Sequence, residues 1–188
     1  MNATVNRFPF IMKAAALTTA ALTITLIVLC RIFDYRWIFA AAISFGTTCY
    51  HFSIRLVIGW IVPMLTACIS PSCWWFQEHR WESSVYEALK VRHWKGKLPT
   101  YAPEQFDPRA NNLHQIVRNT CNAELVHEVI IVFSFLPLTF AFWFGEFPVF
   151  LITSLASAAF DSIFVIAQRY NRPRLMRILK KRRSVDIE

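Results

Sequence analysis

The segment from Ala123 to Glu128 places three ionisable side chains within five positions, at the start of an otherwise apolar stretch. Charge in such a stretch is costly unless it is paired or functional. Glu124 and His127 stand three residues apart and share a face of a helix, so the carboxylate could orient the imidazole and raise its basicity. A dyad of this kind can remove the proton of a hydroxyl group. We therefore predict that His127 and Glu124 are catalytic residues.

A second carboxylate, Glu128, follows Glu124 by four residues on the same face. Like charges at this spacing repel each other unless one is protonated or faces an arginine. Glu-x-x-His also occurs in di-iron helix bundles, but those carry the motif on two helices, and this chain has it once. The five cysteines lack metal-type spacing. We therefore predict no metal site, and a metal centre would have to recruit His79 or His93.

A basic motif, QRYNRPRL from Gln168 to Leu175, directly follows another apolar stretch. Proline removes a backbone donor and stops helices, so Pro173 is expected to end the helix and to spread the neighbouring arginines around a turn. Guanidinium groups bind phosphate with two hydrogen bonds. The motif therefore predicts a binding site for a phosphorylated donor, formed by Arg169, Asn171, Arg172 and Arg174.

The segment from Val91 to Leu98 alternates cations with aromatic residues. Such a patch can hold the phosphates of a soluble donor while a tryptophan lies among lipid headgroups. Anchoring on anionic lipid is an equally good interpretation for each lysine. We assign Arg92 to donor binding, because its guanidinium group can bind a phosphate through two hydrogen bonds.

Further polar side chains lie at the ends of the other apolar stretches. His51 and Arg55 are four residues apart and share a helix face. We predict that they contact the acceptor or stabilise an oxyanion, together with Trp94 and Gln168.

The composition of the chain is that of a membrane protein. Hydrophobic residues make up 55% and aromatic residues 15% of its 188 residues, more than a soluble domain of this size carries. The chain has a net charge of +8, and its basic residues cluster beside apolar stretches. This placement favours anionic lipid over nucleic acid as a partner. A helix crosses the hydrocarbon with about 20 apolar residues. The predicted spans are about 14–30, 37–58, 125–144 and 147–167.

We predict an all-α integral membrane bundle of four transmembrane helices, with residues 1–188 forming a single membrane domain. Residues 70–122 are predicted as a cytoplasmic interfacial helix and loop, because four of the seven tryptophans fall between 74 and 94. Residues 58–69 stay apolar around Pro63, which predicts either a bent helix or a shallow segment. Residues 169–188 form a basic tail that is expected to bind anionic lipid.

The distribution of Lys and Arg predicts the orientation of the spans. With both termini in the cytoplasm, the inner segments carry seventeen basic residues and the outer segments two. This asymmetry follows the positive-inside rule. The sequence therefore predicts a multi-pass protein with cytoplasmic termini.

The segments Val91–Lys97, Ala123–His127 and Gln168–Leu175 together resemble the glycosyl-4,4'-diaponeurosporenoate acyltransferase family of carotenoid biosynthesis. The resemblance covers roughly residues 74–183, and QRYNRPRL is its most specific part. It implies an enzyme of the bacterial cytoplasmic membrane that esterifies a sugar hydroxyl of a glycosylated carotenoid with a fatty acyl group, in a staphyloxanthin-type pathway. It implies no cofactor, with acyl-CoA or acyl carrier protein as co-substrate and a carotenoid glycoside or other membrane lipid as acceptor.

Two other classes of protein would fit the same spans. A different membrane transferase or a reductase could use the arginines to bind a nucleotide cofactor. A non-catalytic membrane partner protein would need none of the inner polar groups. Replacement of His127 without effect would favour the partner protein.

Overall fold

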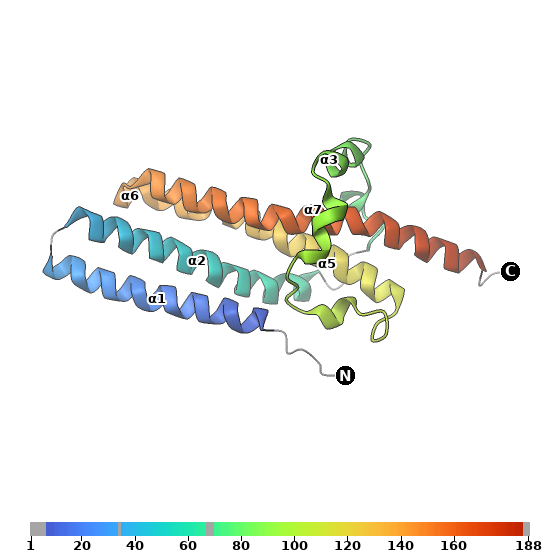
Figure 1. The fold of residues 1–188 in the computed structure, drawn as a ribbon, viewed down its shortest axis with the longest axis horizontal. Coiled ribbons are helices and arrows are strands. Elements are labelled where there is room, and N and C mark those ends of the chain that lie inside the picture. The colour runs from blue at the N-terminus through green and yellow to red at the C-terminus, as the bar shows by residue number, and fades with distance from the viewer. Residues whose placement is uncertain (1–6, 34, 67–69, 186–188) are drawn as a thin grey trace. The chain divides into compact units, whose positions relative to one another are not determined.

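The computed structural model describes residues 7–33, 35–66 and 70–185, with side chains as far as residue 181. Within these ranges every regular element is a helix (Figure 1). The α-helices are α1 (Phe8–Ile32), α2 (Arg36–Leu65), α3 (Glu82–Ala88), α4 (Val91–Trp94), α5 (Leu113–Phe133), α6 (Ala141–Phe144) and α7 (Phe147–Val185). The short 3₁₀ helices are η1 (Trp74–Phe76), η2 (Lys95–Lys97), η3 (Pro103–Phe106) and η4 (Leu136–Phe140).

Four helical segments are long and apolar enough to cross a membrane. They are Phe8–Ile32, Arg36–Leu65, Leu113–Phe144 and Phe147–Lys181. Each predicted span falls inside one of them, which confirms the prediction of an all-α membrane protein with four transmembrane helices.

The observed helices extend beyond the predicted spans. α2 continues through Pro63 to Leu65, so residues 58–65 are part of the same helix, and residues 67–69 lie outside the described part of the chain. α5 begins at Leu113, twelve residues before the predicted span. Its polar first turns belong to the segment predicted as interfacial. Helical hydrogen bonding does not require apolar side chains, so hydropathy alone places this boundary too late.

The chain forms two compact units. Unit 1 comprises Met1–Ile61 and Val129–Asp161, and unit 2 comprises Val62–Glu128 and Ser162–Glu188. Residues of α2, α5 and α7 occur in both units. The single membrane domain stays a prediction.

In unit 1, α1 and α2 pack antiparallel. Cys49 Sγ lies 3.6 Å from the carbonyl oxygen of Ala16. Three residues earlier on α2, a Cβ on Gly46 would lie 3.5 Å from Thr23 Cγ2, which is an ordinary van der Waals contact. A small side chain at position 46 therefore fits where the two helices are in contact.

Hydrogen bonds link α2, the end of α5 and α7 within unit 1. The Tyr50 hydroxyl donates to the carbonyl oxygen of Phe133 at 2.9 Å. The hydroxyls of Ser134 and Ser157, both buried, lie 2.9 Å apart. Such bonds can join helices where lipid supplies no hydrophobic driving force.

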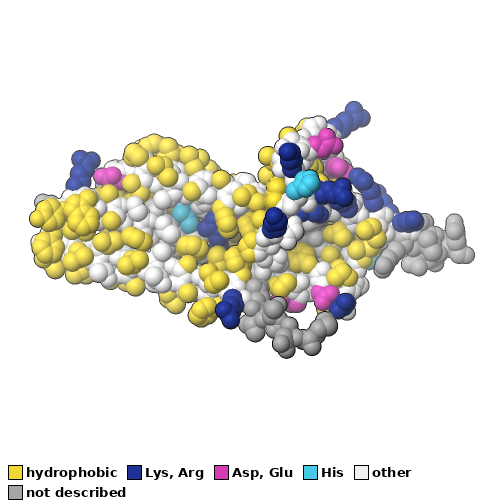
Figure 2. All heavy atoms as spheres, viewed as in Figure 1, with side chains coloured by type: hydrophobic (Ala, Val, Ile, Leu, Met, Phe, Trp, Pro, Cys, Tyr) yellow, Lys and Arg dark blue, Asp and Glu magenta, His cyan; other side chains and the backbone are white. Residues whose placement is uncertain are grey.

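The outer surface of unit 1 is suited to lipid. In Figure 2 hydrophobic side chains cover most of the surface of α1, α2 and α6, whereas Lys and Arg gather over α3 and the end of α7. Phe142 is 90% exposed and Trp143 is 74% exposed. Apolar and aromatic surface of this kind would be unfavourable in water and is expected in a bilayer.

Unit 2 packs short helices against the polar parts of α5 and α7. Val91 and Val117 are fully buried in it. The helix predicted within residues 70–122 is present as α3. Lys90 adopts a left-handed backbone conformation, with φ of 49°, between α3 and α4. This residue therefore ends one helix and redirects the chain into the next.

The expected turn at Pro173 is wrong, because Pro173 lies inside α7, which continues as a helix to Val185. Proline removes one intrahelical hydrogen bond, but a helix can tolerate it where neighbouring helices compensate. The uninterrupted helix places Arg169 and Arg172 three residues apart on one face. The arginines are therefore arranged by helical spacing.

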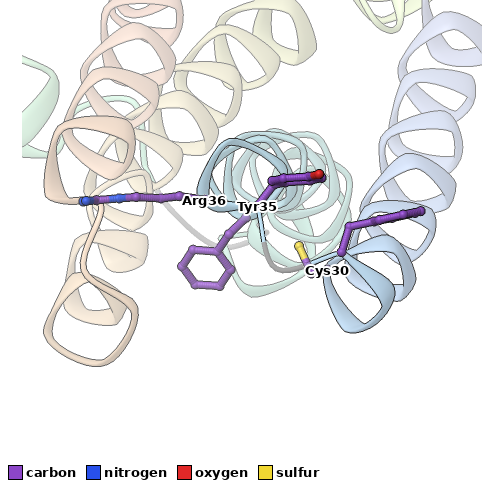
Figure 3. Close-up of a pocket in the computed structure, with 5 residues that line it drawn as sticks. Cys30, Tyr35 and Arg36 are labelled. Atoms are coloured by element: carbon purple, nitrogen blue, oxygen red, sulfur yellow. The ribbon is translucent and has the colours of Figure 1, made fainter.

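A pocket of about 300 Å³ lies between the end of α1 and the start of α2 in unit 1 (Figure 3). Cys30, Phe33, Tyr35, Arg36 and Phe39 line it. Among its described lining residues there is no histidine or carboxylate, so this pocket offers no acid–base pair.

Candidate functional site

The most deeply buried acid of unit 2 is Glu124 on α5, whose side chain has 0% exposure. Arg169 Nε donates to its Oε1 at 2.8 Å, and Arg172 Nη1 donates to its Oε2. Arg172 itself is only 1% exposed. Two guanidinium groups from α7 thus neutralise and fix a carboxylate that would otherwise be very unfavourable to bury.

Arg169 also connects this carboxylate to Glu82, the first residue of α3, which is 1% exposed. Its Nη1 donates to Glu82 Oε1 at 2.9 Å and its Nη2 to the carbonyl oxygen of Trp75 at 3.1 Å. The hydroxyl of Tyr86 donates to Glu82 Oε2 at 2.7 Å. Burial and this hydrogen bond raise the pKa of Tyr86 above its usual range, so the hydroxyl keeps its proton.

Glu128 also faces an arginine, which reduces its repulsion with Glu124 one turn away on α5. Arg169 Nε lies 3.8 Å from Glu128 Oε1, and Trp75 Nε1 donates to Glu128 Oε2 at 2.7 Å. One guanidinium group therefore lies within ion-pair distance of three carboxylates. We call Glu82, Glu124, Glu128, Arg169 and Arg172 the charged cluster.

Arg172 retains one donor without a partner. Its guanidinium carbon lies 5.2 Å from the ring centroid of Phe76. Its buried Nη2 has no hydrogen-bond partner among the residues that the structure describes. A buried donor left unpaired is costly, and in native proteins it calls for an explanation such as a catalytic role or a bound group.

His127 lies one turn beyond Glu124 on α5 and is half-buried. Its ring stacks on Phe164 of α7, with centroids 4.6 Å apart and planes inclined by 11°. The stacking restricts the orientation of the imidazole. The catalytic roles of His127 and Glu124 stay predictions.

A second group of cations lies at the contact between η2 and α7. Lys95 donates to Asn171 Oδ1, and its Nζ lies 4.7 Å from the ring centroid of Tyr170. Arg174 Nη2 donates to the Tyr170 hydroxyl at 2.6 Å, and its guanidinium carbon lies 4.3 Å from the same ring centroid. Tyr86 contacts Tyr170 edge to face at 5.4 Å. We call Lys95, Tyr170, Asn171 and Arg174 the cation pair site.

The other residues predicted in this unit are more scattered. Arg92 is exposed on α4. Trp94 Nε1 donates to the carbonyl oxygen of Leu89 at 2.9 Å. Gln168 is half-buried on α7.

His51 and Arg55 belong to unit 1, where they form a buried polar group with α7. Arg55 Nη1 donates to the carbonyl oxygen of His51 at 2.7 Å. Its Nη2 lies 2.5 Å from Asp161 Oδ2 and 2.8 Å from Ser157 Oγ. Neither ring nitrogen of His51 has a hydrogen-bond partner within the described residues. The acceptor or oxyanion roles of His51 and Arg55 stay predictions.

Several contributors were not predicted as site residues, among them Glu82, Lys95 and Asp161. The spacing of Glu82 and Tyr86, four residues apart on a helix, was a usable signal because such pairs can hydrogen-bond. Lys95 meets Asn171 across 76 residues of sequence, and Asp161 meets Arg55 across 106. Neither contact leaves a local pattern.

The described part of the chain contains no group of three or more His, Cys, Asp or Glu side chains placed to hold a metal ion. The buried charged side chains of unit 2 are carboxylates paired with guanidinium groups.

No curated protein and no solved structure matches the chain significantly. A model of one protein family, glycosyl-4,4'-diaponeurosporenoate acyltransferase, matches residues 72–181. The matched segment is more than half of the 188 residues and contains the charged cluster, His127 and the cation pair site. The chain therefore belongs to the glycosyl-4,4'-diaponeurosporenoate acyltransferase family and is a membrane acyltransferase of carotenoid biosynthesis.

Proposed function

We propose that this enzyme transfers a fatty acyl group from a cytoplasmic thioester to a sugar hydroxyl of a membrane glycolipid, in the first instance a glycosylated carotenoid. The observation that carries the proposal is the buried charged cluster beside His127, inside the segment that the family model matches. Buried ion pairs contribute little net stability compared with apolar packing. Their presence at this position is better explained by chemistry.

The proposed reaction begins with His127 as general base. The hydroxyl oxygen of the acceptor attacks the thioester carbonyl carbon while the imidazole takes the hydroxyl proton. The tetrahedral intermediate collapses, the carbon–sulfur bond breaks, and the leaving thiolate receives the proton from the imidazolium. The new ester remains on the acceptor, and the histidine returns to its neutral state.

Glu124 is suited to hold His127 even though two arginines already bind it. A carboxylate has about four acceptor positions on its two oxygens. The hydrogen bonds from Arg169 and Arg172 leave acceptor capacity for an imidazole N–H from the next turn of the same helix. In this arrangement the two arginines keep Glu124 ionised and in place, and Glu124 sets the tautomer of His127.

The unpartnered Nη2 of Arg172 is our candidate for stabilising the oxyanion of the tetrahedral intermediate. A fixed donor in a dry site stabilises developing negative charge strongly, because it needs no reorganisation during the reaction. A phosphate, in contrast, could bind Arg172 bidentately only by displacing Glu124. We therefore assign the donor phosphates to accessible arginines, Arg92 and Arg174.

The proposed setting is the cytoplasmic membrane of a bacterium, with both termini in the cytoplasm. The lipid acceptor would enter sideways from the bilayer, and the donor would arrive from the cytoplasm. The excess of Lys and Arg in the inner segments supports this orientation.

The test compares membrane lipids, by mass spectrometry, from cells with the gene, without it, and with His127→Ala. We expect one acylated glycolipid to disappear in the deletion and its unacylated precursor to accumulate. His127→Ala should reproduce this pattern, since loss of a general base costs roughly 10² to 10⁴ in rate. The matched control is His114→Ala, an exposed histidine on the same helix. Identical lipid profiles with and without the gene would refute the proposal.

A further inference from the structure

The two cations of the cation pair site lie close together without an acidic partner. Lys95 and Arg174 both contact the ring of Tyr170, at 4.7 and 4.3 Å from its centroid. Within the described residues neither side chain forms an ion pair with a carboxylate. Two neighbouring positive charges repel each other, and the ring of Tyr170 carries no net charge that could neutralise them. The pair therefore carries unbalanced positive charge, which favours an anion as its ligand.

Neutral groups hold both cations in place. Asn171 accepts a hydrogen bond from Lys95, and the Tyr170 hydroxyl accepts one from Arg174. Burial lowers the pKa of Lys95, and the neighbouring charge of Arg174 lowers it further. A bound anion would offset both the cost of burying the Lys95 ammonium group and its repulsion by Arg174. Arg174 is exposed and Lys95 is half-buried, so an anion can reach them from solvent.

The arginines of the charged cluster, in contrast, are bound to carboxylates. Arg169 donates from Nε to Glu124, from Nη1 to Glu82 and from Nη2 to the carbonyl oxygen of Trp75. An incoming phosphate would have to compete with these carboxylates, and their negative charge would repel it. The unneutralised cations are thus Lys95 on η2 and Arg174 on α7, whereas the neutralised arginines lie earlier on α7.

We infer that Lys95 and Arg174 form a phosphate-binding site, positioned by Tyr170 and Asn171. A guanidinium group and an ammonium group together suit a phosphodiester or pyrophosphate. Such a group joins the phosphopantetheine arm of an acyl thioester donor to its carrier protein or nucleotide, and it also occurs in the headgroup of a phospholipid. The first source rests on the proposed function, and the second does not.

The site is linked to the charged cluster through side chains. Tyr86 contacts Tyr170 edge to face and donates to Glu82, and Glu82 accepts from Arg169, which binds Glu124. A donor held by its phosphate at Lys95 and Arg174 would therefore occupy a site that is connected to Glu124 through these side chains.

The test uses the full chain in a maltoside detergent that contains no phosphate. Coenzyme A is titrated in one arm and phosphatidylglycerol in the other, with wild type, Lys95→Met and Arg174→Met. Each variant should bind one of the two probes roughly tenfold more weakly, the usual cost of a lost charge-assisted hydrogen bond. Loss for coenzyme A identifies the donor as the source, and loss for phosphatidylglycerol identifies the headgroup. Arg174 is exposed, so its variant should fold even if Lys95→Met does not.

Arg118→Met is the matched control, because it removes one exposed positive charge from the same unit outside the basic tail. It should change either affinity less than twofold. If Arg174→Met and the control bind both probes as wild type does, the phosphate site is refuted. Acyl transfer from an acyl-N-acetylcysteamine thioester, which has no phosphate, separates the two proposals. Wild type that transfers no acyl group from any thioester contradicts the proposed function, whereas the binding titrations still decide the phosphate site.

Discussion

Glu124 is buried with no exposure, and its charge is balanced by Arg169 and Arg172. At such a position the effect of a substitution depends on what charge it leaves behind. Removing one partner of a buried ion pair is much more damaging than replacing both with neutral groups. The charged cluster should therefore show strong coupling between its members.

We predict that Glu124→Gln destabilises the protein by about 3–5 kcal/mol, because it leaves buried guanidinium charge without its carboxylate. Adding Arg172→Met to Glu124→Gln should restore a large part of this loss, since the double variant buries one charge fewer. Thermal unfolding of the wild type, both single variants and the double variant in detergent gives the coupling. Strictly additive effects would show that Arg172 and Glu124 do not act as a pair.

A second prediction at this scale uses the lowered pKa of Lys95. The ammonium form binds phosphate and the neutral amine does not, so affinity should fall as pH rises through this pKa. The fall should begin below the usual lysine pKa of about 10.4. Coenzyme A titrations over a pH series measure it. Lys95→Arg is the control, because arginine stays protonated and should remove the dependence; an equal fall in that variant would assign the titration to another group.

At the residue scale, the sequence identified most of the polar side chains but few of their partners. Glu124 and the arginines of QRYNRPRL were both predicted as site residues, in separate roles. Their pairing spans 45 and 48 residues of sequence. Spacing patterns report neighbours on one helix, so a contact between α5 and α7 leaves no such pattern.

At the element scale, the helix α7 places two arginines of the motif on one face, where both can bind the same carboxylate. Pro173 lies inside the helix, and Arg169 and Arg172 reach Glu124 from adjacent turns. A turn at Pro173, as the sequence predicts, would instead separate Arg174 from these two side chains.

We therefore predict that Pro173→Ala retains the charged cluster and its activity within roughly threefold. The variant should also be more stable, because proline in a helix interior costs up to about 3 kcal/mol relative to alanine. Product formation and thermal unfolding measure the two effects. Pro173→Gly provides the comparison, since it restores the backbone donor but keeps the helix flexible. Loss of activity in Pro173→Ala with a normal helix content would mean that the proline itself shapes the site.

Hydropathy predicted the existence of the spans better than their ends. α5 begins at Leu113 and α7 runs to Val185, well beyond the apolar stretches. Polar residues extend a helix as readily as apolar ones once a helix is nucleated. His127 lies inside its predicted span, but Glu124 and the arginines that bind it lie in these extensions, where hydropathy gives no signal.

At the scale of the whole molecule, the charge distribution and the four apolar helices predict one orientation. Arg36 and Glu146 pair at 3.4 Å near the ends of two spans, and Phe142 and Trp143 are highly exposed next to them. Aromatic side chains are enriched at both membrane surfaces. This end of unit 1 is therefore the part that we expect to face away from the cytoplasm.

Our last prediction tests that orientation with single cysteines in a variant whose five native cysteines are replaced by serine. Phe144→Cys, beside the outer loop, should react with a membrane-impermeant maleimide in intact cells. Arg109→Cys, an exposed position between η3 and α5, should react only after the cells are permeabilised. We expect this pattern because the predicted inner segments carry seventeen basic residues and the outer segments two, and the positive-inside rule places the basic segments in the cytoplasm. The reverse labelling pattern would place the charged cluster outside the cell, where no acyl thioester is available, and would contradict the proposed donor together with the orientation.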